Sequence, residues 1–443
     1  MATIVKANWR YRQASERFKR LGREFLWIIS GQTLTTLGSL VGVRLLTGLL
    51  SPNVYGELAL GMTLATLVQK VVMGPLGGAA LRFFAPARER NEYSSFLWVL
   101  GRLLVRATGL IILFAGCACL VLLLTGKVNW LWLCMAAFAF AVLSGYNSTL
   151  DGLQNAARQR PIVAWHQAFA TWSRFFAAAG MVMWIGESST VTILGYVSAT
   201  LLVLFSQFWF FRRTLWPEKS VSIARSGSTQ HWESQMFCYA WPFAIWGVFT
   251  WMQIASDRWA LQMFASTREV GLYAVLYQLG YYPIIILTSL MAQMVMPMFF
   301  QHAGDASDLT RMRRVHVLNW RLTVAMLIFT GVAGLMAAAL HRVVFVWLVA
   351  PEYHEVSWLL PGMVLAGGLF ATGQIASIDL MSKVETKKLI APKIVTAAIG
   401  VILNFLGAAW YGVPGVVGSF LTFSVSHFIW VECLVIRGYR KME

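Results

Sequence analysis

Acidic residues are scarce in this chain. Its 443 residues include 19 Asp and Glu against 36 Lys and Arg, which gives a formal net charge of +17 at pH 7. Charged residues of both signs make up only 12% of the chain, whereas 58% of it is hydrophobic. This composition argues against an ordinary soluble domain and is typical of a polytopic membrane protein.

Several familiar chemical motifs are missing as well. The five cysteines fall inside apolar runs and have the spacing of neither a metal site nor a disulfide framework. The seven histidines are scattered, and neither a P-loop nor a dinucleotide-binding fingerprint occurs. We therefore expect a protein that is not an enzyme and that needs no cofactor or metal ion.

Long apolar runs dominate what is present. A helix needs about 20 apolar residues to cross the hydrocarbon core, and runs of this length recur along the whole chain. The runs lack the alternation of barrel strands, which leaves helices as the spanning elements. The sequence predicts an all-α integral membrane protein with about 12 transmembrane helices. The expected spans are 24–50, 57–81, 95–125, 128–149, 163–185, 189–211, 236–263, 272–299, 316–340, 356–378, 391–411 and 413–436.

The Lys and Arg distribution predicts the orientation of these spans. With residue 1 in the cytoplasm, most basic residues lie in cytoplasmic segments, and the opposite side holds only Lys127, Arg268 and Arg342. Both termini are then cytoplasmic, and the positive charge reflects topology rather than nucleic-acid binding. Residues 1–23 are expected to form a basic amphipathic segment on the membrane surface, because the apolar run that follows is too long for a signal peptide.

The two halves of the chain repeat one another. Ser51–Ala59 follows the first expected span and Ser266–Ala274 follows the seventh, with Ser, Gly and Ala at a constant offset. Six spans in each half give both halves the same orientation, as in transporters built from parallel repeats. We therefore expect an N-lobe at 24–213, a cytoplasmic linker at 214–235 and a C-lobe at 236–443. Further matches in the same order are Phe83-Phe84 with Phe299-Phe300 and Asp151 with Asp379.

Basic residues inside the expected spans are the strongest functional signal. They are Arg44, Lys70, Arg102, Arg106, Arg174, Arg258 and Arg321, and Asp257 is the one acidic residue found well away from an expected cytoplasmic end. A charge at membrane depth is costly, so such residues usually face a water-filled cavity or a partner. Because one aspartate cannot neutralise seven cations, the simplest partner is an anionic substrate.

Four of these cations are candidate substrate-binding residues, because Thr or Gln side chains share their helix faces or because they occupy equivalent places in the repeat. They are Arg44, Lys70, Arg174 and Arg258. Asp257 is a candidate coupling residue, and pairing with Arg258 or Arg44 is its alternative structural role.

Two further groups have a functional and a structural interpretation. Arg102, Arg106 and Arg321 lie near cytoplasmic ends, where they either face the cavity or extend to lipid headgroups. Tyr273, Tyr277 and Tyr281 recur at every fourth position, where their rings either stack on sugars or pack in the protein.

These residues also carry a family resemblance. Val43–Thr47 leading into Leu50–Gly56, and Asp257-Arg258 leading into Glu269–Tyr273, resemble the polysaccharide (O-antigen type) flippases of the multidrug/oligosaccharidyl-lipid/polysaccharide (MOP) exporter superfamily. The resemblance extends over essentially the whole chain. It implies a V-shaped, MATE-like pair of six-helix lobes in the bacterial inner membrane.

The resemblance also implies a function. Members move undecaprenyl-pyrophosphate-linked oligosaccharide, an O-antigen or exopolysaccharide repeat unit, from the cytoplasmic to the periplasmic leaflet by alternating access. The family's cationic cavity maps onto Arg44, Lys70, Arg174 and Arg258, and a polysaccharide polymerase and a chain-length regulator are expected partners beside membrane lipids. The residue chemistry agrees, because a pyrophosphate needs Arg or Lys in a desolvated cleft.

Three other functions are less well supported. A drug/cation antiporter of the same superfamily should carry acidic residues in its cavity, and a lipid II flippase usually has additional spans. A membrane glycan polymerase or ligase usually needs a substantial external loop, and the longest one expected here is 341–355.

Overall fold

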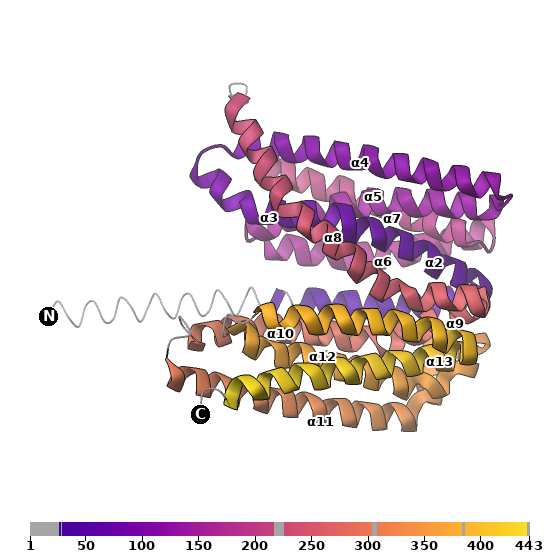
Figure 1. Ribbon diagram of the computed structural model, residues 1–443. Helices are drawn as coiled ribbons and strands as arrows, with labels where there is room; N and C mark the ends of the chain where they lie inside the picture. Colours follow the sequence, from indigo (N-terminus) through magenta and orange to yellow (C-terminus); the bar gives the residue numbers. More distant parts are fainter. Residues whose placement is uncertain (1–25, 28, 217–225, 304–307, 383–385, 441–443) are drawn as a thin grey trace. The chain divides into compact units, whose positions relative to one another are not determined.

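The computed structural model describes residues 26–27, 29–216, 226–303, 308–382 and 386–440, and nearly all of these are helical. The expected surface segment 1–23 lies outside the described residues. A first helix over residues 29–47 precedes the labelled elements. The α-helices that follow are α2 (Pro52–Val68), α3 (Gly74–Glu89), α4 (Tyr93–Leu124), α5 (Val128–Ala156), α6 (Arg160–Ile185), α7 (Ser189–Thr214), α8 (Ser226–Phe264), α9 (Thr267–Gly280), α10 (Tyr282–Ala303), α11 (Leu309–Leu348), α12 (Leu360–Ser382) and α13 (Ile390–Arg440) (Figure 1). Three short helical segments complete the list, the π-helix η1 (Gln69–Met73) and the 3-10 helices η2 (Pro351–Leu359) and η3 (Thr386–Leu389).

Within the described part of the chain, nine segments are long and apolar enough to cross a membrane. α4 is typical, because its most apolar stretch has a mean hydropathy of 2.6 while only 11% of that stretch is buried in the protein. Residues such as Leu113, Phe114 and Leu124 point their side chains outward from it. An apolar surface of this extent fits contact with lipid, which makes this a multi-pass membrane protein.

One of the nine segments contains two helices. The run Ala391–Tyr439 is interrupted at Gly412, whose φ of 58° and ψ of −135° are not helical, and Pro414 follows closely. A positive φ is easily adopted only by glycine, so the chain can turn here. The expected boundary between the spans 391–411 and 413–436 falls at this residue.

The chain forms two compact units. The described residues of the first unit lie within Met1–Gly42, Val68–Met181 and Ile193–Ile245, and those of the second within Val43–Leu67, Val182–Thr192 and Trp246–Glu443. The expected N-lobe and C-lobe divide the chain differently, because Val43–Leu67 and Val182–Thr192 lie with the second unit. That the protein has two lobes that move against each other stays a prediction.

Part of the expected linker 214–235 is helical. α8 begins at Ser226, about ten residues before the span expected from hydropathy. The early part of α8 is polar, and an apolar window therefore misses it. Its Glu233 forms the ion pairs described below.

Each unit is organised around one central helix. In the first unit α5 packs against α3 and α4, and in the second α12 packs against α10, α11 and α13 (Figure 1). Sixteen residues of α12 are buried, including small ones such as Gly367, Gly368 and Ala371. Small residues let neighbouring helices approach closely, which replaces the hydrophobic driving force that is absent between helices in lipid.

The repeated segments meet inside the second unit. Gly56 of α2 lies against the backbone of α9, and Gly271 of α9 lies against the backbone of α2. A methyl group added to Gly56 would overlap the carbonyl oxygen of Thr267, and one added to Gly271 would overlap that of Pro52. The two glycines that correspond in the repeat therefore form a reciprocal backbone contact.

We expect Gly56→Ala to destabilise the protein by about 2 kcal/mol, because the added methyl group must displace the α9 backbone. Gly109→Ala in α4 is the matched control, since nothing lies within 4 Å of its added methyl group and alanine favours the helix. Thermal unfolding in detergent should show a lower Tm for Gly56→Ala only. Equal Tm values would show that α2 and α9 are not in close contact.

Candidate functional site

The first unit holds two of the four candidate cations. Lys70 is exposed and lies in the π-helical turn η1. This turn arises because the Gly74 amide bonds to the carbonyl of Gln69, and the next residue, Pro75, has no amide hydrogen to continue the α-helical pattern. The side chain of Gln69 donates to Ser148 of α5 at 3.1 Å and fixes the turn.

Arg174 is held more closely than Lys70. Its Nε donates to the carbonyl of Ala170 at 3.1 Å, and its guanidinium lies 6.0 Å from the centre of the Phe140 ring. For Lys70, no carboxylate among the described residues lies within salt-bridge distance. A positive charge at membrane depth without an acidic neighbour is the pattern expected of an anion-binding residue.

The second unit places Asp257 and Arg258 in one buried cluster. Asp257 is fully buried, and its Oδ2 accepts from the Tyr273 hydroxyl at 2.7 Å. Its Oδ1 accepts from the Arg258 backbone amide at 2.7 Å and lies 3.8 Å from Arg258 Nη1. The Arg258 guanidinium also lies over the Tyr277 ring, 4.9 Å from its centre.

This cluster compensates the charge of Arg258 within the protein. The Arg258 side chain is 13% exposed, so little of it contacts solvent. A buried ion pair is tolerated only where further hydrogen bonds satisfy it, which Tyr273 does here. The alternative pairing of Asp257 with Arg258 is therefore present in the structure, and the role of Arg258 as an anion ligand stays a prediction.

Arg44 also has a protein partner. Its Nη1 donates to the carbonyl of Val349 at 2.5 Å, and three residues later Thr47 Oγ1 accepts from the amide of Ala350 at 3.3 Å. Tyr353 donates to the carbonyl of Leu50 at 2.7 Å. The segment 341–355, expected as an external loop, is mostly helical and binds the end of the first helix.

The three candidate stacking tyrosines pack against protein. Tyr273 is fully buried and Tyr281 is 7% exposed. The Tyr277 and Tyr281 rings lie 4.9 Å apart, and Tyr281 also meets Phe420 edge-on at 4.9 Å. The structure thus shows these tyrosines packed in the protein, and stacking on a glycan stays a prediction.

Sequence analysis overlooked one acidic residue that is central to the first unit. Glu233, placed in the expected linker, lies in α8 and forms salt bridges with both Arg102 and Arg106 of α4. Both arginines thus have an acidic partner in the structure, and whether they also extend to lipid headgroups or face the cavity stays a prediction. The spacing of Arg102 and Arg106 by one helical turn was the available signal for a shared partner.

The two aspartates that correspond in the repeat both have side-chain partners in the structure. Asp151 of α5 accepts from Gln167 at 3.1 Å and from Gln207 at 2.6 Å. Its counterpart Asp379 of α12 is fully buried and lies 3.5 Å from Nδ1 of His316. Both aspartates of the repeat are thus held by side chains from other helices.

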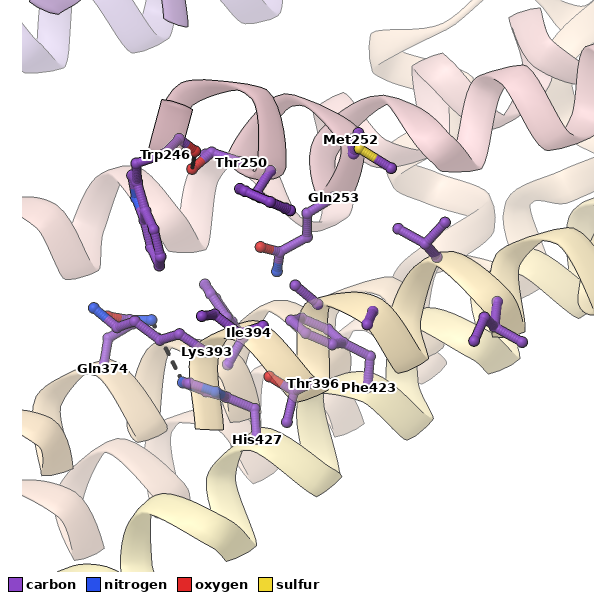
Figure 2. Close-up of a pocket in the computed structure, with 16 residues that line it drawn as sticks. Trp246, Thr250, Met252, Gln253, Gln374, Lys393, Ile394, Thr396, Phe423 and His427 are labelled. Atoms are coloured by element: carbon purple, nitrogen blue, oxygen red, sulfur yellow. Dashed lines mark hydrogen bonds between the residues drawn. The ribbon is translucent and has the colours of Figure 1, made fainter. Parts of the chain in front are cut away.

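Sequence analysis also missed a pocket of about 450 Å³ in the second unit. Its lining comes from α8, α12 and α13, and Figure 2 shows Lys393, Gln374 and His427 toward one end of it. In the sequence alone, Lys393 resembles any other cation of a cytoplasmic turn. No single stretch of sequence predicts such a pocket, because its walls are more than one hundred residues apart in the chain.

Within the described chain, no group of three or more His, Cys, Asp or Glu residues is placed to hold a metal ion. The described residues offer separated cations, a buried ion pair and an apolar pocket.

Comparison with known proteins places the chain in context. The model of a family described as polysaccharide biosynthesis protein matches residues 21–303. No curated protein matches the chain.

Solved structures share its fold. The lipid II flippase MurJ in an inward closed conformation is 13% identical with a TM-score of 0.66, covering 94% of this chain and 89% of its own. A multidrug resistance MATE family transporter of the MOP superfamily, inward-facing, is 11% identical with a TM-score of 0.63, covering 93% and 96%. The MATE transporter VcmN of Vibrio cholerae, in its bent form, is 14% identical with a TM-score of 0.54, covering 95% and 99%. At these identities the likeness establishes an integral membrane MATE-like fold.

We expect Asp257→Ala to destabilise the protein by about 3 kcal/mol or more, because it leaves the buried Arg258 charge without its carboxylate. Glu355→Ala is the control from the same unit. Its salt bridge to Arg268 is nearly half exposed and should contribute about 1 kcal/mol at most. If thermal unfolding gives the two variants the same Tm, the Asp257–Arg258 pair does not stabilise the protein more than an exposed salt bridge does.

Proposed function

We propose, because this chain belongs to the polysaccharide biosynthesis protein family, that it is a flippase for a lipid-linked oligosaccharide. In this proposal it moves an undecaprenyl-pyrophosphate-linked repeat unit of an O-antigen or exopolysaccharide from the cytoplasmic to the periplasmic leaflet. The membrane is the bacterial inner membrane, and the movement occurs by alternating access.

The observation that carries the proposal is the positive charge of Lys70, which no carboxylate of the described residues compensates. It lies at membrane depth in a π-helical turn, a feature often found at functional sites, and its side chain is exposed. A pyrophosphate carries two or more negative charges and is held best by Lys or Arg where water is limited. Arg174 of the same unit is the second ligand that we propose.

Arg44 and Arg258 complete the proposed cationic set. Both have protein partners in the described conformation, Val349 for Arg44 and Asp257 for Arg258. Alternating access exposes a site to each side in turn, so ion pairs formed in one state can be exchanged for substrate contacts in another. Asp257 is the proposed coupling residue, because a buried carboxylate can exchange its arginine for a proton.

The proposal includes a topology. Nine apolar segments, the first helix, α8 and the division of the last segment at Gly412 together fit twelve spans, with both termini cytoplasmic. A polysaccharide polymerase and a chain-length regulator are the proposed partners, since a repeat unit delivered to the outer leaflet must be assembled further.

Deleting the gene tests the function directly. We expect a complete repeat unit on undecaprenyl pyrophosphate to accumulate in the inner membrane, out of reach of a periplasmic glycan-modifying enzyme. Mass spectrometry of extracted lipids identifies the unit. Accumulation of the same lipid in a periplasm-accessible form would point instead to a polymerase or ligase.

Point variants test the proposed ligands. We expect Lys70→Ala and Arg174→Ala each to lower the translocation rate about tenfold in reconstituted vesicles, because each removes a charge-assisted contact to the pyrophosphate. Lys70→Arg should retain most activity. Lys127→Ala should retain all of it, because Lys127 is expected on the side of the membrane opposite to the cytoplasm. The proposal is wrong if Lys70→Ala, Arg174→Ala and Arg258→Ala, normally expressed, all translocate at the wild-type rate.

A further inference from the structure

The pocket of the second unit has one polar end and one apolar end. Figure 2 shows Lys393 and Gln374 close together with His427 below them, and Met252 toward the far end. The apolar part continues along α13 through Val401 and Ile402, two turns beyond Lys393. Its volume of about 450 Å³ lies in the range typical of small-molecule sites.

Two groups at the polar end lack a counterpart among the described residues. No carboxylate of the described chain pairs with Lys393, which lies near the beginning of the candidate span Ala391–Tyr439. His427 is 2% exposed, and its Nδ1 has no hydrogen-bond partner among the described residues. A buried polar atom without a partner is costly, so this end is suited to a ligand with oxygen atoms.

Few other polar groups remain for a ligand. The Thr250 hydroxyl donates to the carbonyl of Trp246 at 3.0 Å, and the Thr396 hydroxyl donates to that of Pro392 at 2.5 Å. Gln253 and Gln374 are the remaining amide side chains of the lining, and Gln374 Nε2 lies 3.5 Å from His427 Nε2. The other lining residues between α8 and α13 are mostly apolar, whereas a sugar ring needs hydrogen-bonding partners around its whole rim. The pocket therefore suits a ligand with one anionic head and an apolar body.

The apolar walls are largely aromatic. Trp246 and Phe249 of α8 face the pocket from one side, and Phe370 and Phe423 from the other. Phe370 lies 5.1 Å and Phe423 6.2 Å from the His427 ring, which holds the imidazole in place. These rings offer flat faces to the apolar body of a ligand, such as the methyl-branched alkenes of a polyprenyl chain.

We propose that this pocket binds the phosphate-proximal end of a polyprenyl phosphate, with the phosphate at Lys393 and His427 and the first isoprene units between α8 and α13. The inference rests on the proposed function, since the lipid is the carrier of the proposed substrate. It adds a carrier-binding site, separate from Lys70 and Arg174, that recognises the lipid rather than the glycan.

Binding of undecaprenyl phosphate without sugar tests the site. The purified chain in phosphatidylcholine nanodiscs is titrated with radiolabelled undecaprenyl phosphate. We expect Lys393→Gln to weaken binding at least about tenfold, because it removes a charge-assisted contact and retains a polar side chain of similar size. Lys393→Arg should bind nearly as well as the wild type.

Arg437→Gln is the control, since Arg437 is an exposed cation of α13, beyond the interruption at Gly412, that does not line the pocket. A second measurement does not depend on variants. A polyprenyl phosphate with a photoreactive group on its second isoprene unit should label Phe249, Met252 or Ile402 of the wild-type chain. Labelling confined to other helices would overturn the proposal.

Competition with unlabelled compounds identifies which kind of anionic ligand the pocket binds. Unlabelled undecaprenyl phosphate should displace the probe, whereas inorganic pyrophosphate and phosphatidylglycerol at the same concentration should not. Displacement by pyrophosphate would mean a site for free phosphate, and displacement by phosphatidylglycerol a site for any anionic lipid. Either result overturns the assignment to a polyprenyl phosphate.

Translocation measured on the same preparations separates this inference from the proposed function. A chain that translocates lipid-linked glycan but binds the carrier independently of Lys393 overturns the pocket and leaves the flippase function intact. A chain that binds the carrier through Lys393 but translocates nothing supports the pocket and overturns the function.

Discussion

The close contact between the backbones of α2 and α9 is the constraint on which the second unit depends. Two glycines that correspond in the repeat, Gly56 and Gly271, let these helices approach to a distance that no side chain would permit. Tyr55 can then reach Gln278, and Trp259 can reach Thr63. In lipid, where apolar surface alone does not drive association, such contacts and hydrogen bonds hold helices together.

The basic residues of the apolar helices fall into two groups, those with a carboxylate partner in this chain and those without one among the described residues. Arg102, Arg106 and Arg258 each have a carboxylate from this chain, so their charges stabilise helix packing. Lys70 and Lys393 have none among the described residues. A lysine away from water without a carboxylate partner is costly, which is why we propose an anionic ligand for each of these two lysines, and they lie in different units of the protein.

Hydropathy predicted the spans because it is a property of consecutive residues, and the kink at Gly412 falls where two spans were separated. It missed the polar beginning of α8 and therefore Glu233, whose partners are two arginines more than 120 residues away in the chain. Partners such as Val349 for Arg44 are equally remote in sequence. The pocket at Lys393 was beyond sequence reasoning for the same reason, since three helices contribute its walls.

The points at which the chain passes between its two units lie inside helices or next to helix irregularities rather than in loops. One passage lies at Val68 beside the π-helical turn, and another follows Ile245, one turn after Pro242 within α8. The first helix and α6 change units at Gly42 and Met181. Because the backbone is helical at these points, the two units are joined through hydrogen-bonded turns rather than through irregular chain.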